Sequence, residues 1–340
     1  MAIESPGGKR HALVTGGSGF LGGHVCERLL GEGARVTCLD DLSSGRAENV
    51  ERFLPSPRFR FVEGDVRRDI PPLAYTEIWN LASPASPPRY QENPVETLMV
   101  NVVGTKAVLD VALACGARVL QASTSEVYGD PDVHPQVESY RGSVNTTGPR
   151  ACYDEGKRAA EALCFDYRRM HGLDIRVARI FNTYGPRMDP LDGRVVTNFI
   201  VAALQGKPLE LNGGGRQTRS FCYCEDLVEG LSRLMRHPRV DQPVNIGNPH
   251  EVTIADLARQ VVDLVGIEAR FAESEMPADD PGRRCPDISW AVANLGWTPA
   301  VPLREGLSRT IAHFARPGTP SARVAPLPDA MRPTGDTARA

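Results

Sequence analysis

A glycine-rich turn between a short apolar segment and a helical pattern constrains the fold of this chain more than any other feature. Residues 11–15 form the apolar segment, Gly16, Gly19 and Gly22 follow it, and a helical pattern then continues to Leu30. Glycines at these positions allow a tight turn, bring the backbone close to a pyrophosphate at the helix N-terminus, and let the helix pack on the sheet. The segment therefore predicts an α/β fold, a Rossmann-type doubly wound parallel sheet that binds a dinucleotide.

Two acidic residues stand at the end of the second predicted strand, residues 35–39. Asp40 lies at the distance from the glycines where a carboxylate binds the two hydroxyls of a ribose. Asp41 adds a second negative charge, and no basic residue follows directly, so a 2′-phosphate would be repelled. The predicted cofactor is therefore NAD rather than NADP.

Three further apolar segments predict strands at residues 59–62, 77–81 and 118–122. A helical pattern at residues 95–114 lies between the last two. The strands of a parallel sheet end on one edge, and ligands bind outside that edge. Asp65 follows the first segment, where it is placed to accept a hydrogen bond from the adenine amine, with Val66 beside it. Leu81 and Ala82 end the next segment, where the chain would pass along the cofactor. The remaining cofactor contacts predicted from the turn are Gly16, Gly19, Phe20, Leu21 and Gly22.

A tyrosine and a lysine four residues apart, Tyr153 and Lys157, lie in a segment that predicts a helix over residues 152–170. Residues four apart share one face of a helix, so the phenol and the ammonium can reach the same cleft. A phenol titrates near ~10, and a nearby cation favours the phenolate. The pair therefore predicts a proton-abstracting tyrosine, although the same spacing also occurs on solvated helix faces.

The strand at residues 118–122 runs into a polar segment that contains Ser123, Thr124, Ser125 and Glu126. A hydroxyl at this strand end is placed to share the proton of Tyr153 and to bind a substrate oxygen. Serine and threonine at a strand end are also common in ordinary turns. The segment alone leaves both interpretations open.

Composition excludes several classes of protein. The net charge of −3 provides no broad electrostatic surface for nucleic acid or an anionic membrane. The sequence contains no evident run of ~20 apolar residues and no apolar segment at its start, which favours a cytoplasmic protein. Its eight cysteines are scattered, as is typical of reduced and buried thiols. Cys222 and Cys224 have no cysteine or histidine partners at metal-ligand spacing, so no metal is predicted.

The second half of the chain has a different pattern. After a predicted strand at 174–180, residues 181–193 form a loop rich in proline, glycine and polar residues, which is typical of a binding loop on a rigid support. Short mixed elements follow as far as residue 314 and indicate a smaller α/β lid region over the sheet edge. The predicted organisation is a flexible N-terminus (1–10), a Rossmann domain (11–180), a lid region (181–314) and a disordered tail (315–340).

Together these features resemble the extended short-chain dehydrogenase/reductase family from residue 11 to about residue 314, and within it the UDP-glucuronate decarboxylases, which make UDP-xylose. The most specific string is Gly148-Pro149-Arg150-Ala151-Cys152-Tyr153-Asp154-Glu155-Gly156-Lys157-Arg158. Other segments that carry the resemblance are residues 82–88, 123–131, 178–188, 192–196 and 217–221.

The resemblance implies roles for individual residues. It implies that Thr124, Tyr153 and Lys157 form a hydride-transfer triad that also contacts the cofactor, with Ser125 and Glu126 beside the sugar. Arginines that would bind a nucleotide-sugar diphosphate are Arg187, Arg194, Arg219 and Arg284, because a planar guanidinium binds phosphate in a bidentate manner. Further substrate contacts implied are Ser86, Tyr90, Asn182 and Asn198. Arg284 is also placed at the sugar, whereas an ordinary surface arginine would pair with Asp279 or Asp280. The family further implies a homodimer formed by paired helices, and the apolar faces of residues 95–114 and 152–170 would allow it.

The implied reaction begins when Tyr153 removes the C4 hydroxyl proton of UDP-glucuronate while the C4 hydride passes to NAD+. The product is a ketone β to the carboxylate, which loses carbon dioxide readily, and return of the hydride gives UDP-xylose.

Three alternatives stay open. A nucleotide-sugar 4,6-dehydratase shares the triad but typically has Asp-Glu where this chain has Ser125-Glu126. A 4-epimerase usually has small residues at the position of Glu126. A non-catalytic NAD-binding regulator would have no need of an intact triad. Departures from the decarboxylase pattern at Arg89, Thr146, Thr147, Cys222 and Cys224 leave the identity of the nucleotide open.

Overall fold

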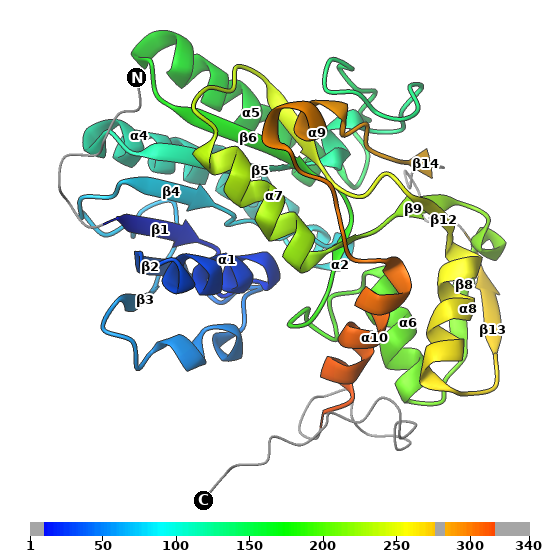
Figure 1. The fold of residues 1–340 in the computed structure, drawn as a ribbon. Helices are drawn as coiled ribbons and strands as arrows, with labels where there is room; N and C mark the ends of the chain where they lie inside the picture. Colours follow the sequence, from blue (N-terminus) through cyan, green and yellow to red (C-terminus); the bar gives the residue numbers. More distant parts are fainter. Residues whose placement is uncertain (1–9, 276–282, 317–340) are drawn as a thin grey trace, which may run out of the picture.

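The computed structural model describes residues 10–275 and 283–316 (Figure 1). In this part of the chain, a parallel sheet of seven strands has the order β11-β6-β5-β4-β1-β2-β3. Its strands are β1 (His11–Thr15), β2 (Arg35–Asp40), β3 (Phe59–Glu63), β4 (Glu77–Asn80), β5 (Arg118–Thr124), β6 (Ile175–Ile180) and β11 (Pro243–Ile246). The predicted doubly wound parallel sheet is confirmed.

Helices cover both faces of this sheet (Figure 1). One face carries α1 (Phe20–Gly31), α7 (Cys224–Arg236) and α9 (Ser289–Leu295), whose apolar residues share a core with β1 and β2. The other face carries α4 (Thr105–Cys115) and α5 (Ala151–His171), which enclose a second core. Short helices α2 (Pro87–Glu92) and α3 (Pro94–Met99) precede α4. The carboxyl edge of the sheet stays uncovered by these layers and faces the lid region.

The lid region has its own apolar core. It contains α6 (Val195–Leu204), α8 (Ile254–Val265), α10 (Leu303–Phe314) and the parallel pair β8 (Leu209–Asn212) and β13 (Phe271–Ser274). A small sheet of order β12-β9-β14 joins β12 (Glu251–Thr253), β9 (Thr218–Ser220) and β14 (Arg283–Arg284). The chain leaves this sheet at Phe221, and the next strand, β10 (Cys222–Tyr223), pairs with β7 (Thr183–Tyr184).

The chain returns to the large sheet after entering the lid region. Strand β11 pairs with β6 at the sheet edge, and α7 packs beneath it, although both lie beyond residue 180, where the sequence analysis ended the Rossmann domain. β11 was not predicted because a four-residue segment with one polar member, Asn245, carries little periodic signal. The large sheet therefore includes a strand from beyond residue 180.

One continuous helical stretch, Pro94–Cys115, is long and apolar enough to cross a membrane, a feature that the sequence analysis overlooked. It joins α3 and α4 through a π-helical turn at Val100–Gly104, and it packs against α5. Only about a third of its most apolar 18-residue window is buried (33%). Helices that cover a sheet in soluble proteins pass the same test of length and composition, so the finding is weak evidence of a membrane span.

Some predictions fall outside the described residues. These are the flexible N-terminus apart from Arg10, the disordered tail apart from Ala315 and Arg316, and the two acidic residues Asp279 and Asp280.

Candidate active site

A cavity of about 920 Å³ lies between the carboxyl edge of the sheet and the lid region. Most of the predicted site residues line it, although they come from segments far apart in the sequence. Those that line it are Gly16, Gly19, Phe20, Leu21, Gly22, Leu81, Ser86, Tyr90, Thr124, Ser125, Glu126, Tyr153, Lys157, Asn182, Arg187, Arg194, Asn198, Arg219 and Arg284. The predicted residues Asp40, Asp41, Asp65, Val66 and Ala82 are not among its lining residues.

The glycine turn has the shape that a dinucleotide requires. Gly16 has a φ of 66°, and a Cβ on it would lie 2.8 Å from the backbone of Ala82. A Cβ on Gly22 would lie 2.0 Å from the carbonyl oxygen of Gly16. The turn therefore accepts only glycine at these two positions, and it leads directly into the N-terminus of α1 at Phe20. This arrangement fits the pyrophosphate of NAD.

Asp40 lies beside this turn and is 7% exposed. Its carboxylate accepts hydrogen bonds from the backbone N–H groups of Ser18 and Leu42, each at 2.9 Å. Burial raises the pKa of Asp40, while these backbone hydrogen bonds act in the opposite direction. The structure thus fixes the orientation of the carboxylate next to the turn, as the prediction of a ribose-binding acid requires.

The other predicted cofactor contacts outside the cavity lining have partners within the protein. Asp65 is held by Arg67, whose Nη2 donates to Oδ2 at 2.7 Å, and this contact lowers the pKa of Asp65. Val66 is 5% exposed, and its side chain belongs to the core beneath α4. Asp41 accepts hydrogen bonds from Ser43. The contacts of these residues with a dinucleotide stay predictions.

Tyr153 and Lys157 both lie on the face of α5 that borders the cavity, beside Thr124 at the end of β5. Burial raises the pKa of Tyr153 and the negative charge of Glu126 raises it further, while a hydrogen bond with Thr124 lowers it. In the described structure burial and Glu126 outweigh the lowering contributions, so the net fall in this pKa that the sequence predicts is not found. The ammonium of Lys157 donates to the carbonyl of Ala122 at 3.1 Å and lies 5.6 Å from the centre of the Tyr153 ring.

Burial also lowers the pKa of Lys157 to about 8. Below pH 8 the folded protein must keep a buried ammonium. Between pH 8 and the ordinary lysine pKa of 10.5, the folded state has released this proton while the unfolded state still holds it. We therefore expect Lys157→Met to be more stable than the wild type at pH 7, by roughly 1–3 kcal/mol, and this difference to shrink as pH rises through that window.

Urea unfolding of both proteins at pH 7 and at pH 9.5 measures this difference. A variant that is less stable than the wild type at pH 7 would mean that the hydrogen bond of Lys157 outweighs its desolvation.

Tyr90 supports the ring of Tyr153. The two rings are stacked, with centroids 5.0 Å apart and planes within 6° of each other. Tyr90 is 1% exposed, and its hydroxyl has no hydrogen-bond partner in the described residues. This contact holds the Tyr153 ring in one orientation, so Tyr90, predicted as a substrate contact, also positions the base.

Glu126 is held between two arginines on the cavity wall. Both guanidinium Nη atoms of Arg284 contact the carboxylate, with Nη2 2.9 Å from Oε2, and Nη2 of Arg150 lies 2.6 Å from the same oxygen. Burial raises the pKa of Glu126, but the two arginines outweigh burial and lower it. Arg284 is 4% exposed, so the alternative of a solvated surface arginine is wrong.

Sequence reasoning assigned no role to Arg150 or to Asp154, although both stand in the string around Tyr153. Asp154 is 7% exposed, and one of its carboxylate oxygens has no hydrogen-bond partner in the described residues. Burial, followed by the charge of Glu126, raises the pKa of Asp154 to about 7. Their position in the sequence, close to the predicted base Tyr153, was the signal that could have identified both residues.

The remaining predicted diphosphate contacts converge on the lid side of the cavity. Arg187 lies on its loop with a φ of 72°, and its guanidinium is 2.5 Å from Glu27 of α1. Arg219 of β9 is 5% exposed. Arg194 precedes α6, and Asn198 on that helix donates to the carbonyl of Gly193 at 3.0 Å. Asn182 lies at the base of the same loop.

Comparison with known proteins agrees with this geometry. The family model described as "NAD dependent epimerase/dehydratase family" matches residues 12–247. A UDP-glucuronic acid decarboxylase of Xenopus tropicalis is 50% identical over 310 residues, which cover 91% of this chain and 73% of the relative. A second such decarboxylase, from Arabidopsis thaliana, is 51% identical over 296 residues, with 87% and 86% of the two chains covered.

Solved structures extend the comparison to more distant relatives. A UDP-glucose 4-epimerase of Thermotoga maritima, solved with UDP-glucose, has a TM-score of 0.83 at 27% identity, covering 89% of this chain and 98% of that chain. A dTDP-glucose 4,6-dehydratase of Streptomyces venezuelae with NAD bound has a TM-score of 0.82 at 28% identity, covering 89% and 96%. With the glycine turn, the Tyr153–Lys157 pair and these matches together, the chain belongs to the NAD-dependent epimerase/dehydratase family, which lies within the extended short-chain dehydrogenases/reductases.

Proposed function

We propose that this protein is a UDP-glucuronate decarboxylase that uses NAD and produces UDP-xylose. The observation that carries the proposal is a buried cation on the cavity wall beside the base. Arg284 is 4% exposed, lines the same cavity as Tyr153 and contacts Glu126, so its guanidinium is placed to reach an anionic group of the substrate. Asp154, whose pKa is raised to about 7, carries only part of a negative charge at neutral pH. A sugar carboxylate is the anion that this position suits. The 50% identity to decarboxylases over most of the chain supports the same activity.

In this mechanism Tyr153 acts as the general base that takes the proton of the C4 hydroxyl. Thr124 donates a hydrogen bond that stabilises the phenolate, and the stack with Tyr90 keeps the ring oriented. The glycine turn and Asp40 would hold NAD+, which would supply the oxidising power as the acceptor of a hydride from C4 and the donor that later returns it.

The resulting 4-keto sugar is a β-keto acid, which releases carbon dioxide as electrons move into the ketone. Tyr153, now protonated, donates to the enolate oxygen that develops at C4, and Thr124 assists it. Arg284 orients the carboxylate before it leaves. Protonation at C5 then completes the pentose, and no external oxidant is consumed.

An NMR time course with purified protein and UDP-glucuronate tests the proposal. Signals of UDP-xylose should replace those of the substrate without added NAD being reduced in proportion. Accumulation of a 4-keto product, formation of an epimer, or conversion of a nucleotide-glucose to its 4-keto-6-deoxy product would assign the chain to another branch of the family. The dehydratase alternative lacks support at position 125, because Ser125 lines the cavity but its hydroxyl is too weak an acid to protonate a leaving hydroxyl.

Asp40 should select NAD, since its carboxylate is placed for the ribose hydroxyls. We expect Asp40→Ala to weaken NAD binding by about 1.5–3 kcal/mol, the range for hydrogen bonds to a charged group. Glu63 is an exposed acid on β3 that pairs in register with Asp40, so Glu63→Ala is a matched control that should bind NAD normally. Calorimetric titration with NAD and NADP measures both effects, and tighter binding of NADP by the wild type would contradict the assignment.

The homodimer is also proposed. Val95, Leu98 and Met99 of α3 are exposed by 66%, 37% and 40%, although they lie beside α5 in the structure. An apolar patch at a helix pair is typical of a face that a second copy covers. Sedimentation velocity should show a dimer, and a monomer at micromolar concentration would contradict this proposal.

A further inference from the structure

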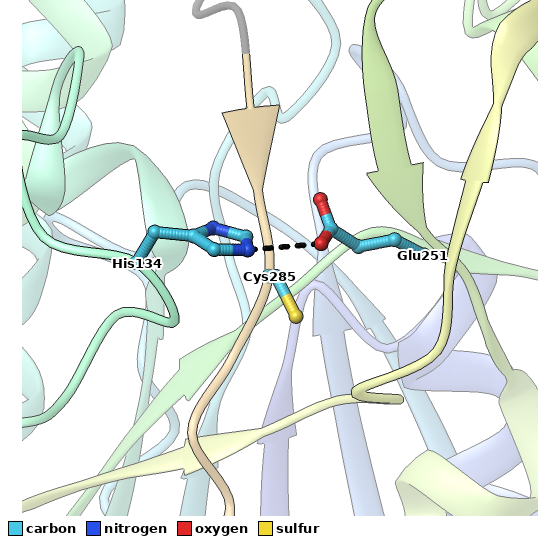
Figure 2. A group of neighbouring side chains, drawn as sticks. All are labelled: His134, Glu251 and Cys285. Carbon is cyan, nitrogen blue, oxygen red and sulfur yellow. Dashed lines mark ion pairs between the residues drawn. The ribbon is translucent and has the colours of Figure 1, made fainter.

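A cluster of three side chains with different ligand atoms lies outside the proposed active site (Figure 2). His134 comes from the loop that follows β5, Glu251 from β12, and Cys285 directly follows β14. Their ring nitrogen, carboxylate oxygen and sulfur atoms all lie within 4.8 Å of one another. Nε2 of His134 is 2.9 Å from Oε2 of Glu251. Figure 2 shows the three side chains converging from separate segments.

We propose that His134, Glu251 and Cys285 form a binding site for a thiophilic divalent cation, Zn²⁺. Zinc takes nitrogen, oxygen and sulfur ligands at about 2.0–2.3 Å, which places tetrahedral ligand atoms about 3.3–3.8 Å apart. The three atoms need only small side-chain adjustments to reach these separations. The sulfur and nitrogen ligands exclude magnesium and calcium, which prefer oxygen. Water would complete the coordination as the fourth ligand.

The surrounding contacts orient the proposed ligands. The hydroxyl of Thr218 donates to Oε1 of Glu251 at 2.6 Å, which leaves Oε2 directed at His134. Gln136 is fully buried and makes two hydrogen bonds to the backbone of Cys285. Its backbone N–H donates to the Cys285 carbonyl, and its side-chain Oε1 accepts from the Cys285 N–H, each at 2.8 Å. His134 lies two residues before Gln136, so these hydrogen bonds hold the segment of His134 next to the segment of Cys285. Such outer contacts are typical of metal sites with fixed geometry.

In the described structure, the side chain of Arg283 contacts two of the three proposed metal ligands. Its Nη2 atom lies 3.0 Å from Nε2 of His134 and 3.5 Å from Oε2 of Glu251. The guanidinium and a metal ion therefore compete for the same two ligands. The Arg283 side chain is 60% exposed, so it can move into solvent when a metal binds. This competition makes removal of Arg283 a gain-of-binding test.

Binding also changes the protonation of one ligand. Zinc binds cysteine as the thiolate, so the sulfur–zinc bond forms as the Cys285 proton leaves to solvent. No oxidation or reduction takes place. The sequence analysis missed the site because its ligands are 117 and 34 residues apart, far from the spacing of a local zinc motif.

Equilibrium titration of the full-length, reduced protein with ZnCl₂ alone tests the proposal. We expect one zinc ion per chain in the wild type, at least tenfold weaker binding in His134→Ala and in Cys285→Ser, and tighter binding in Arg283→Ala. Cys115→Ser is the matched control, because Cys115 is partly exposed and lies on α4, away from the cluster, and its binding should equal that of the wild type.

Cobalt(II) in place of zinc gives a second readout, since a sulfur-to-cobalt charge-transfer band should appear in the wild type and be lost in Cys285→Ser. Wild-type protein that binds no zinc at micromolar concentration overturns the proposal and leaves an ion-pair network. Equal zinc affinity in His134→Ala, Cys285→Ser and the wild type also overturns it. His134 is at the surface, so His134→Ala is informative even if Cys285→Ser folds poorly.

Discussion

Replacing Tyr153 by phenylalanine should slow the conversion of UDP-glucuronate by at least ~10²–10⁴-fold, the contribution expected of a general base. The substitution removes only the hydroxyl. The phenylalanine ring retains the stack with Tyr90, and the hydroxyl that is lost has Thr124 as its hydrogen-bond partner. Fold and NAD binding should therefore be unchanged. Single-turnover measurements at saturating substrate report the loss directly.

A combined variant gives a sharper test of the same mechanism. Because Tyr153 and Lys157 act as one unit, Tyr153→Phe together with Lys157→Met should cost much less than the product of the two single effects. Tyr167→Phe is the matched control, since it removes a phenol hydroxyl from the same helix, α5, at a residue that does not line the cavity. Turnover close to that of the wild type in Tyr153→Phe would rule out this base.

Arg284→Ala should reduce decarboxylation by about 10²-fold or more, because a bidentate charge-assisted contact is worth several kcal/mol in a buried site. The carboxylate of the substrate would lose its partner, and Glu126 would keep only Arg150. Removing one member of a buried ion pair costs up to about 3–5 kcal/mol, so the free energy of unfolding should fall as well. Activity must be assayed well below the melting temperature of the variant.

The control for this variant is Arg239→Ala. Arg239 is an arginine that is 83% exposed and pairs with Asp241 on the surface, where ion pairs contribute little. It should match the wild type in both activity and stability. If Arg284→Ala decarboxylates normally while Arg284→Ala and Arg239→Ala differ only in stability, Arg284 has a structural role and the substrate carboxylate binds elsewhere.

The strands that the sequence predicted well are those with a strong local signal. Residues 11–15, the glycine turn and the helix after it could be predicted because each depends on neighbours within a few positions. Alternation of apolar strands with helices then determined the parallel sheet. β11 could not be predicted, because its four residues become a strand only through pairing with β6.

The candidate site divides in the same way. Tyr153 and Lys157 are four residues apart on one helix, so their common face is visible in the sequence. The contact of Arg284 with Glu126 spans 158 residues, and no spacing rule predicts it. Resemblance to a family placed Arg284 at the sugar, but its pairing with Glu126 and the second contact from Arg150 required coordinates. The rise in the pKa of Tyr153 could not be predicted, because burial, its largest cause, is a property of the folded protein.

Arg284 and Arg219 occupy paired positions on neighbouring strands, since β14 runs beside β9 with these two residues in register. One of them is proposed to hold the sugar carboxylate and the other the diphosphate. On this proposal the carboxylate and the diphosphate of one substrate would be held by two hydrogen-bonded strands, and not by independent loops. The position of the diphosphate would then set the position of the reacting sugar, so the release of carbon dioxide would depend on a group that takes no part in the chemistry.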